Sequence, residues 1–285
     1  MAGCASRERK PTLNLEFRCI EPAPQLAAHV RHYWVLRGER SDAPAHPVFP
    51  DGCGEIVFNL GAPAYELQQS GRLTAQPRAM LVGQMTRPLA MVPGGALRMV
   101  GIKLAPWGAA AILGEASAAV RDRTIALSDL DPATLARLGD QLDGCRCDDH
   151  VGAVLDRPLR ARLAAAGTRR LDRLGRLAQA LRHTSGASVD AWARASGYSA
   201  RTLERHFDRF VGMSPKELSR VRRFQRALHL AREQPTLRWA AIAASAGYCD
   251  QAHMGRDFRR FAGCAPTLVA PSSTPITTAF VHDQG

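Results

Sequence analysis

Side chains that can hydrogen-bond to the edges of bases recur on predicted helices in the C-terminal third of the sequence. Arg201, Thr202 and Arg205 form one such group, and Gln251 and Arg256 form a second. Arginine can donate two hydrogen bonds to the O6 and N7 atoms of guanine, and glutamine can pair with the N6 and N7 positions of adenine. The sequence therefore predicts that these five residues contact bases in the major groove of double-stranded DNA.

A second group of polar residues near the first is suited to phosphate. It consists of Ser199, Lys216, Arg222, Arg259 and Arg260. Hydroxyl, ammonium and guanidinium groups donate hydrogen bonds to phosphate oxygens, and such contacts fix the register of a protein on the duplex without reading its sequence. The alternative for any of the arginines in the two groups is a solvated surface charge.

The distribution of charge favours the DNA interpretation. Residues 167–270 contain 19 Lys and Arg against 8 Asp and Glu, whereas residues 1–166 contain 19 against 17. Almost all of the net charge of +12 therefore lies on one segment, as expected for a surface that binds phosphates. An anionic membrane would attract the same charge, but the chain has no run of 18 apolar residues, so we expect no membrane partner.

The basic segment contains a duplicated pattern. The anchor residues of the two copies are offset by 50 positions before a turn and by 51 after it. They are Ala193, Gly197, Leu203, Phe207, Gly212 and Pro215 in the first copy, and Ala243, Gly247, Met254, Phe258, Gly263 and Pro266 in the second. Two copies in register argue against chance similarity in an alanine-rich chain.

The pattern predicts two helix-turn-helix units. A small alanine lets two helices cross closely, and a glycine four residues later permits the positive φ of a tight turn. Ser199 and Asp250 can cap the helix that follows each turn. The alternative is a helical bundle in which the repeats mark only helix packing. Gly255 lies in the second recognition helix and weakens it, so we expect the first unit to discriminate more strongly between sequences.

Residues of about 171–270 resemble the C-terminal DNA-binding domain of the AraC/XylS transcription regulators. The resemblance rests on the run from Gly247 to Met254, the Phe258-Arg259-Arg260-Phe261 segment, Gly263 with Pro266, and Arg223-Phe224 with Ala227-Leu228. It implies two helix-turn-helix units joined by a long helix, and a transcription regulator whose recognition helices enter successive major grooves. Cys249 and Met254 depart from the usual Ser or Thr and Phe.

The N-terminal half is predicted to be rich in strands. Apolar or alternating runs occur over residues 13–17, 55–60, 80–82 and 99–104, and Gly and Pro separate them. We expect helices over residues 25–32, 106–113 and 148–166, and around Asp131-Pro132. The predicted fold is thus an α+β N-terminal domain, strand-rich and cupin-like, joined by helices to an all-α C-terminal domain. The predicted parts are a flexible N-terminus (1–12), a sensor domain (13–115), a helical linker or dimerisation region (116–166), the DNA-binding domain (167–270) and a disordered tail (271–285).

This half resembles the domain of uncharacterised function that precedes such DNA-binding domains in many bacterial regulators. The likeness lies in Tyr33-Trp34, the run from Pro50 to Leu60, Leu81-Val82-Gly83-Gln84, and Gly101 with residues 106–114. It implies an effector-sensing role but names no ligand. Trp34, Glu55 and Asn59 are candidates to line a ligand pocket; the alternative is a core tryptophan with outward-facing Glu and Asn.

Metal and cofactor sites are not predicted. No His-x-His motif occurs, and His29 and His32 lie on an expected helix at a spacing common among surface histidines. Cys145, Cys147 and the residues up to His150 are dense in potential ligands but lack the usual zinc spacing. Thiol sensing at Cys53, Cys145 or Cys147 and incidental cysteines remain open alternatives.

Two classes of function follow. The first is a cytoplasmic one-component regulator, without a secretory signal, that binds promoter DNA under control of an unknown small molecule. RNA polymerase and a second copy of the chain are further expected partners by resemblance. The second is a DNA-binding domain fused to a cysteine-based redox or alkyl-transfer domain. No Pro-Cys-His, Gly-x-Ser-x-Gly or phosphate-binding loop is present, so we expect no enzyme activity.

Overall fold

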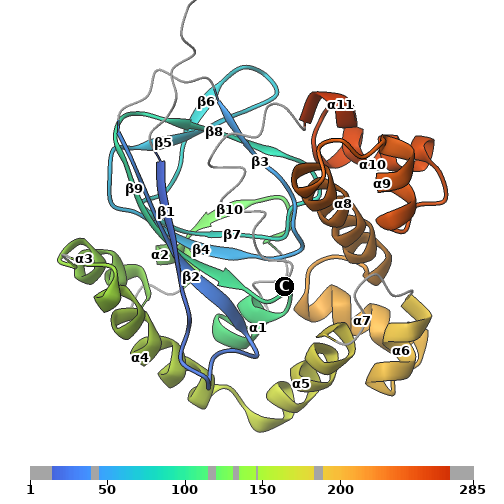
Figure 1. Cartoon of the computed structure of the whole chain (residues 1–285). Helices are drawn as coiled ribbons and strands as arrows, with labels where there is room; N and C mark the ends of the chain where they lie inside the picture. Colours follow the sequence, from blue (N-terminus) through green and yellow to red (C-terminus); the bar gives the residue numbers. More distant parts are fainter. Residues whose placement is uncertain are drawn as a thin grey trace, which may run out of the picture.

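The computed structural model describes residues 15–39, 45–114, 120–130, 135–145, 147–182 and 189–269. Among these residues, β-strands occur in the N-terminal half together with short helices, and the elements of the C-terminal half are helices (Figure 1). This order confirms the predicted fold class. The expected N-terminal extension and C-terminal tail, and the expected helix at Asp131-Pro132, lie outside the described residues.

Two antiparallel sheets form a sandwich. The first sheet has the order β1-β2-β9-β4-β7-β10, with bounds Leu15–Ile20, Val30–Gly38, Leu97–Leu104, Glu55–Asn59, Ala79–Val82 and Thr124–Ala126. The second has the order β3-β8-β5-β6, with bounds His46–Val48, Leu89–Pro93, Ala64–Leu67 and Leu73–Ala75. The expected strands at 13–17, 55–60, 80–82 and 99–104 correspond to β1, β4, β7 and β9.

The central strands of the first sheet are buried on both faces. Tyr33 and Val35 of β2 belong to a core shared with helices, whereas Trp34 and Leu36 belong to a core shared with the second sheet. Side chains alternate between the faces of a strand, so one apolar run supplies both cores. The second of these cores surrounds the pocket described below.

Helices cover the outer face of the first sheet. They are α1 (Gly108–Ile112), α2 (Leu127–Leu130), the 3₁₀ helix η2 (Leu135–Arg137), α3 (Leu138–Asp143) and α4 (Asp149–Ala165). Asp156 of α4 accepts a hydrogen bond from the Tyr33 hydroxyl at 2.8 Å, and Arg37 donates to Asp148 at 2.9 Å. The bond from Arg37 holds the pKa of Asp148 below its usual value. Much of the segment expected to be a linker therefore packs on the sandwich.

The helix expected over residues 25–32 is wrong. Residues 24–29 form turns, with the Leu26 amide donating to the Ala23 carbonyl, and β2 begins at Val30. Tertiary pairing explains the difference, because β2 is hydrogen-bonded to β1 on one side and to β9 on the other. His32 is consequently a strand residue and not a helical neighbour of His29.

In the C-terminal part, the described residues form seven helices. The first helix-turn-helix unit is α6 (Val189–Ser196) and α7 (Ala200–Phe210), and the second is α9 (Trp239–Ser245) and α10 (Gln251–Phe261). Between them runs α8 (Pro215–Glu233); α5 (Thr168–Arg182) precedes the first unit, and α11 (Pro266–Val269) follows the second. Gly197 and Gly247 have φ of 68° and 85°, which confirms the predicted turns.

The helix α8 holds the two units together. Its Phe224 ring lies 5.0 Å from Phe258 and 5.4 Å from Phe261 in the second unit. Its Leu218 belongs to the core that contains Phe207 of the first unit. With 19 residues it spans roughly 28 Å. The separation of the two recognition helices is thereby fixed by one continuous helix.

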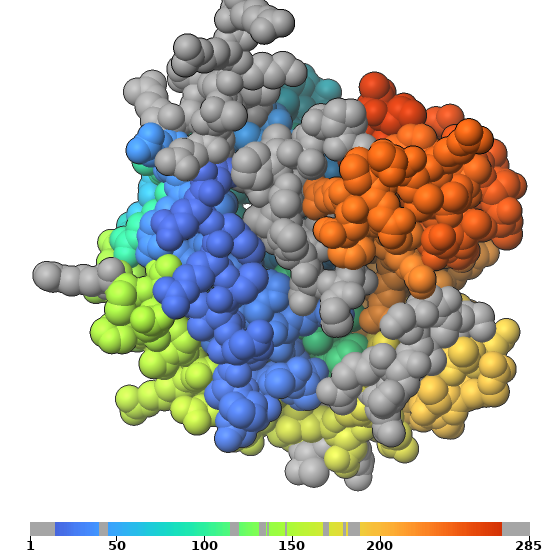
Figure 2. Space-filling view, viewed as in Figure 1, coloured from blue at the N-terminus to red at the C-terminus, as the bar shows by residue number. Residues whose placement is uncertain are grey.

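The C-terminal part lies along one side of the sandwich (Figures 1 and 2). The Phe49 ring meets Phe224 of α8 edge-on at 6.0 Å, and Gln225 of α8 donates to the Pro50 carbonyl at 2.6 Å. Arg121 pairs with Glu217 of α8 at 2.7 Å. The segment 49–53 therefore forms a bridge between the sandwich and α8, and Arg121 forms a second contact.

Candidate nucleic-acid interface and ligand pocket

The first recognition helix, α7, presents its predicted base-contacting residues outward. Arg201 and Arg205 are exposed one turn apart, and Thr202 is half-buried beside them. The Ser199 side chain accepts a hydrogen bond from the Thr202 amide at 3.2 Å, which confirms Ser199 as the N-cap. Phe207 is fully buried on the opposite side of the helix. The amphipathic pattern thus leaves one basic face of α7 exposed to solvent.

The second recognition helix, α10, repeats this arrangement with fewer polar groups. Gln251 and Arg256 are exposed, and Asp250 caps the helix by accepting from the His253 amide. Met254 is fully buried. Gly255 is buried, but a Cβ added to it would meet no atom within 4 Å, so the position has room for a small side chain and offers none to contact a base.

Replacement of Gly255 with alanine should raise the free energy of unfolding by about 0.5–1 kcal/mol, because alanine has the higher helix propensity and the site has room. Chemical denaturation measures this change. The control is Gly263→Ala: the φ of Gly263 is 76°, so alanine there should destabilise the same unit. A loss of stability in Gly255→Ala would contradict the open geometry.

The predicted phosphate-contacting residues fall into two classes. Ser199, Lys216 and Arg259 are exposed without a competing ion pair among the described residues. Arg260 pairs with Glu217. Arg222 donates to the Leu181 carbonyl at 3.1 Å and lies over the Trp192 ring at 5.5 Å. Burial lowers the pKa of Arg222 to about 10, so the guanidinium stays charged at neutral pH while it holds α8 against its neighbours.

Two ion pairs that sequence reasoning missed fasten α10 to α8. Arg220 donates two hydrogen bonds to Asp257, at 2.6 and 3.0 Å, and Asp257 is fully buried. Glu217 joins Arg260 of α10 to Arg121 of the sandwich. These partners are 37 to 96 residues apart, and no local pattern in the sequence indicates them. They orient the second recognition helix relative to the connector.

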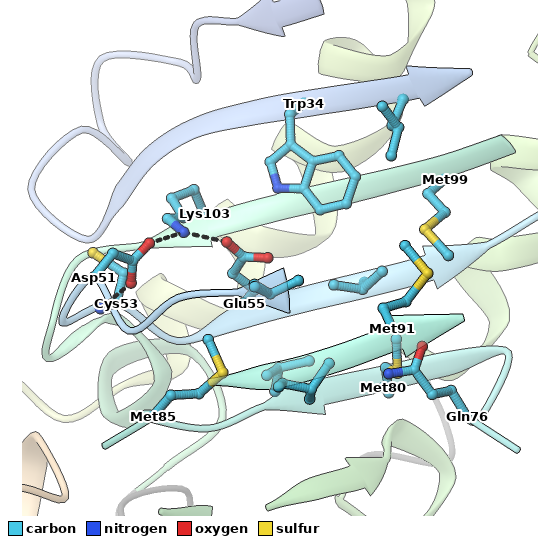
Figure 3. Close-up of a pocket in the computed structure, with 15 residues that line it drawn as sticks. Trp34, Asp51, Cys53, Glu55, Gln76, Met80, Met85, Met91, Met99 and Lys103 are labelled. Atoms are coloured by element: carbon cyan, nitrogen blue, oxygen red, sulfur yellow. Dashed lines mark hydrogen bonds and ion pairs between the residues drawn. The ribbon is translucent and has the colours of Figure 1, made fainter. Parts of the chain in front are cut away.

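A pocket lies between the two sheets (Figure 3). The pocket is partly open to solvent. Its wall is largely apolar and includes Met80, Met85, Met91 and Met99, which come from both sheets or the loop between them. Methionine side chains adapt to irregular apolar ligands, so this is the strongest candidate for an effector site.

One end of the pocket carries a buried ion cluster. Lys103 of β9 pairs with both Asp51 and Glu55, and Glu55 is its cross-strand neighbour on β4 (Figure 3). Burial acts to lower the pKa of Lys103, but the two carboxylates together raise it. Burial raises the pKa of Glu55, and the charge of Lys103 opposes that shift. The ammonium is therefore firmly protonated between the carboxylates.

Two of the three predicted ligand-binding residues line the pocket, and the third does not. Trp34 and Glu55 line the pocket, and the indole of Trp34 lies across Gly101, where a Cβ would overlap the ring. Asn59 does not line it; the side chain donates to the Ala62 carbonyl at 2.9 Å and accepts from the Gly61 amide. Neither Glu55 nor Asn59 faces outward, since both are buried.

The cysteines and histidines form no evident metal centre. Among the residues that the structure describes, no group of three or more His, Cys, Asp or Glu is placed to hold a metal ion. Burial raises the pKa of Cys145, which disfavours the reactive thiolate. Cys53 lines the pocket, and Cys147 is exposed. In the same described ranges, no helix is both long and apolar enough to cross a membrane.

Family models match both halves of the chain. A domain of unknown function, DUF6597, matches residues 18–126, and a helix-turn-helix domain matches residues 192–270. Among curated proteins, none matches this sequence.

Solved structures with a similar arrangement include ToxT from Vibrio cholerae O395, with 11% identity, a TM-score of 0.45, and coverage of 91% of this chain and 98% of that one. Wild-type ToxT from strain SCE256, bound to an unsaturated fatty acid, has 10% identity, a TM-score of 0.43, and coverage of 93% and 96%. An AraC-type regulator from Chromobacterium violaceum has 23% identity and a TM-score of 0.33, and it covers 35% of this chain and 93% of its own.

The matched segments coincide with the structural parts described above. Among the described residues, the first match covers most of the sandwich strands and α1, and the second runs from within α6 to α11. The comparisons give no support to a cysteine-based redox or alkyl-transfer domain. The chain thus joins a segment that matches DUF6597 to a segment that matches an AraC-type helix-turn-helix domain, and the second match supports a DNA-binding transcription regulator.

Proposed function

We propose that this protein binds specific DNA sites by inserting α7 and α10 into successive major grooves, and that a small molecule in the sandwich pocket controls this binding. Arg201, Thr202, Arg205, Gln251 and Arg256 would contact bases. Ser199, Lys216 and Arg259 would contact phosphates, with Arg260 able to join them if it leaves Glu217. Dimerisation and contact with RNA polymerase remain predictions.

The length of α8 bears on the shape of the bound DNA. Major grooves on one face of a straight duplex recur about every 34 Å, whereas α8 spans roughly 28 Å. If α8 sets the spacing of the recognition helices below one helical turn, the DNA must bend toward the protein. Bending costs on the order of 1–6 kcal/mol and depends on sequence, so it adds shape readout to the base contacts.

One observation carries the proposal of ligand control. Within the segment 49–53, Asp51 and Cys53 line the pocket, whereas the Pro50 carbonyl accepts a hydrogen bond from Gln225 of α8. Gly52 packs against Leu218 of the same helix. A ligand that displaces Asp51 therefore acts on a segment that is bound directly to the helix carrying both DNA-reading units.

The first experiment is selection of genomic DNA fragments by the purified full-length protein, followed by binding to the selected site and to scrambled DNA across a salt series. We expect affinity for both DNAs to fall steeply with salt, and a preference of about 4–10 kcal/mol for the selected site. Equal affinity for both DNAs at every salt concentration would overturn sequence-specific regulation.

The contact between the segment 49–53 and α8 can be tested by substituting two glycines that have nearly the same φ. Gly52 and Gly71 have φ of 80° and 81°, but a Cβ would overlap Leu218 only at Gly52 and would meet nothing at Gly71. Gly71→Ala should cost about 1–2 kcal/mol of stability from backbone strain alone. Gly52→Ala should cost about 1–3 kcal/mol more from overpacking, and it alone should change affinity for the selected DNA. Equal effects of both variants would contradict the bridge.

A further inference from the structure

Glu217 pairs with two arginines that come from different parts of the chain. Its Oε2 lies 2.7 Å from the guanidinium of Arg121 in the sandwich, and its Oε1 accepts a hydrogen bond from Arg260 of α10. Glu217 is only 9% exposed, whereas both arginines are exposed and can be solvated. A charge that is nearly buried is costly without a partner, so the carboxylate depends on these ion pairs more than either arginine does.

Arg121 lies in a turn that is fixed to the sandwich beside its pocket. The next residue, Asp122, has φ of 53°, and its carboxylate accepts from the amide and the hydroxyl of Thr86 at 2.6 and 2.7 Å. The Asp122 amide donates to the Gln84 carbonyl at 2.9 Å. Met85, between these two partners, lines the sandwich pocket. The sandwich therefore sets the position of Arg121 through residues next to the pocket.

Arg260 is suited to leave Glu217 for a DNA phosphate. It lies four residues after Arg256 on α10, and residues at this spacing share one face of a helix. The cost of leaving depends on what remains on Glu217. Without another cation the carboxylate would be nearly buried and unpaired, whereas with Arg121 in place it keeps one ion pair.

We propose that Arg121 is a positioning residue for DNA binding, which holds Glu217 and thereby lets Arg260 contact a phosphate. While the sandwich keeps Arg121 on Glu217, Arg260 is available to DNA. A change in the sandwich that withdraws Arg121 leaves Arg260 as the remaining partner of Glu217, and one phosphate contact is lost. This inference rests on the proposed function, because it assigns how the sandwich acts on a DNA contact predicted there.

A simple docking contact between Arg121 and α8 has a different consequence. Loss of docking would change DNA binding whether or not Arg260 is present, and it would not remove a phosphate contact from the salt dependence. Sharing of Glu217 instead makes the effect of Arg121 depend on Arg260. A double-mutant cycle with a salt series separates the two cases.

The first variant is Arg121→Gln, studied in the full-length protein by fluorescence anisotropy with the selected site and with scrambled DNA. It should weaken binding to both DNAs severalfold. The slope of log affinity against log salt should become shallower by up to about 0.9, the value for one phosphate contact. The matched control is Arg123→Gln, which removes the same charge from an exposed arginine without an ion pair among the described residues. Equal effects of the two variants would indicate net charge alone and overturn the inference.

Two backgrounds test the dependence on Glu217 and Arg260. With Arg260→Gln, the substitution Arg121→Gln should have no further effect on affinity or salt slope, because the contact that it permits is already absent. Glu217→Gln should tighten binding to both DNAs, and Arg121→Gln should be silent there too. Circular dichroism checks that each variant is folded. Additive effects of Arg121→Gln and Arg260→Gln, or normal DNA binding by Arg260→Gln, would show the inference to be wrong.

The same measurements separate this inference from the proposed function. A preference for the selected site with additive effects of the two arginines would reject the role of Arg121 and leave the regulator intact. Equal affinity for both DNAs, with the effect of Arg121→Gln still dependent on Arg260, would reject sequence-specific regulation and leave the role of Arg121 intact.

Discussion

Replacing Lys103 with methionine should lower the free energy of unfolding by about 3–5 kcal/mol, because it leaves Asp51 and Glu55 buried without their shared cation. Denaturant titration of the full-length protein, followed by far-UV circular dichroism, measures the loss. Lys216→Met is the matched control: Lys216 is exposed at the start of α8, so its loss should change stability by no more than about 0.5 kcal/mol.

The pH dependence of the Lys103→Met variant distinguishes a charge effect from a packing effect. Burial raises the pKa of Glu55, and the substitution removes the charge of Lys103 that opposes this shift. A carboxyl whose pKa is higher in the folded state than in the unfolded state takes up a proton on folding. The loss in free energy of unfolding caused by Lys103→Met should therefore become smaller as the pH falls from about 7 to about 5. A loss in free energy of unfolding that does not change with pH would instead indicate lost packing.

The combined Arg201→Ala and Arg205→Ala substitution should reduce the preference for the selected site over scrambled DNA by about 2–6 kcal/mol. This estimate takes each arginine as one bidentate guanine contact worth about 1–3 kcal/mol. Both side chains are exposed on α7, so the fold should be retained. Competition binding against the two DNAs at fixed salt measures the change.

The control for that experiment is Arg226→Ala, which removes an exposed arginine from α8. A phosphate contact or a distant charge contributes equally to all sequences, so this variant should weaken binding to both DNAs alike. If the α7 variant behaved in the same way, Arg201 and Arg205 would be phosphate contacts and the base-reading assignment would be wrong.

Local sequence was sufficient to predict the turns, the helix caps and several strands, because each depends on a short pattern of residues. The turns at Gly197 and Gly247 and the caps at Ser199 and Asp250 each depend on residues within one or two helical turns, and the structure has all four. The strands at 55–60 and 99–104 were also evident, because buried strands are continuous apolar runs.

Residues 25–32 show where local reasoning fails. Their composition permits a helix, but hydrogen bonding to two neighbouring strands selects a strand from Val30 onward. Arg222 shows a related effect of packing. As a basic residue near two recognition helices it is a reasonable phosphate contact, yet the packing of α8 directs its guanidinium to the Leu181 carbonyl.

The sequence by itself determined the DNA-reading half of this protein: two duplicated units, their basic faces and their order along the chain. Only the tertiary structure decided the pocket, the cluster around Lys103 and the bridge from residues 49–53 to α8. Lys103 lies about 50 residues from its two acidic partners, and Gln225 lies 175 residues from Pro50. Such pairs form because strand register and helix packing bring distant residues together, and no periodicity within one segment encodes them.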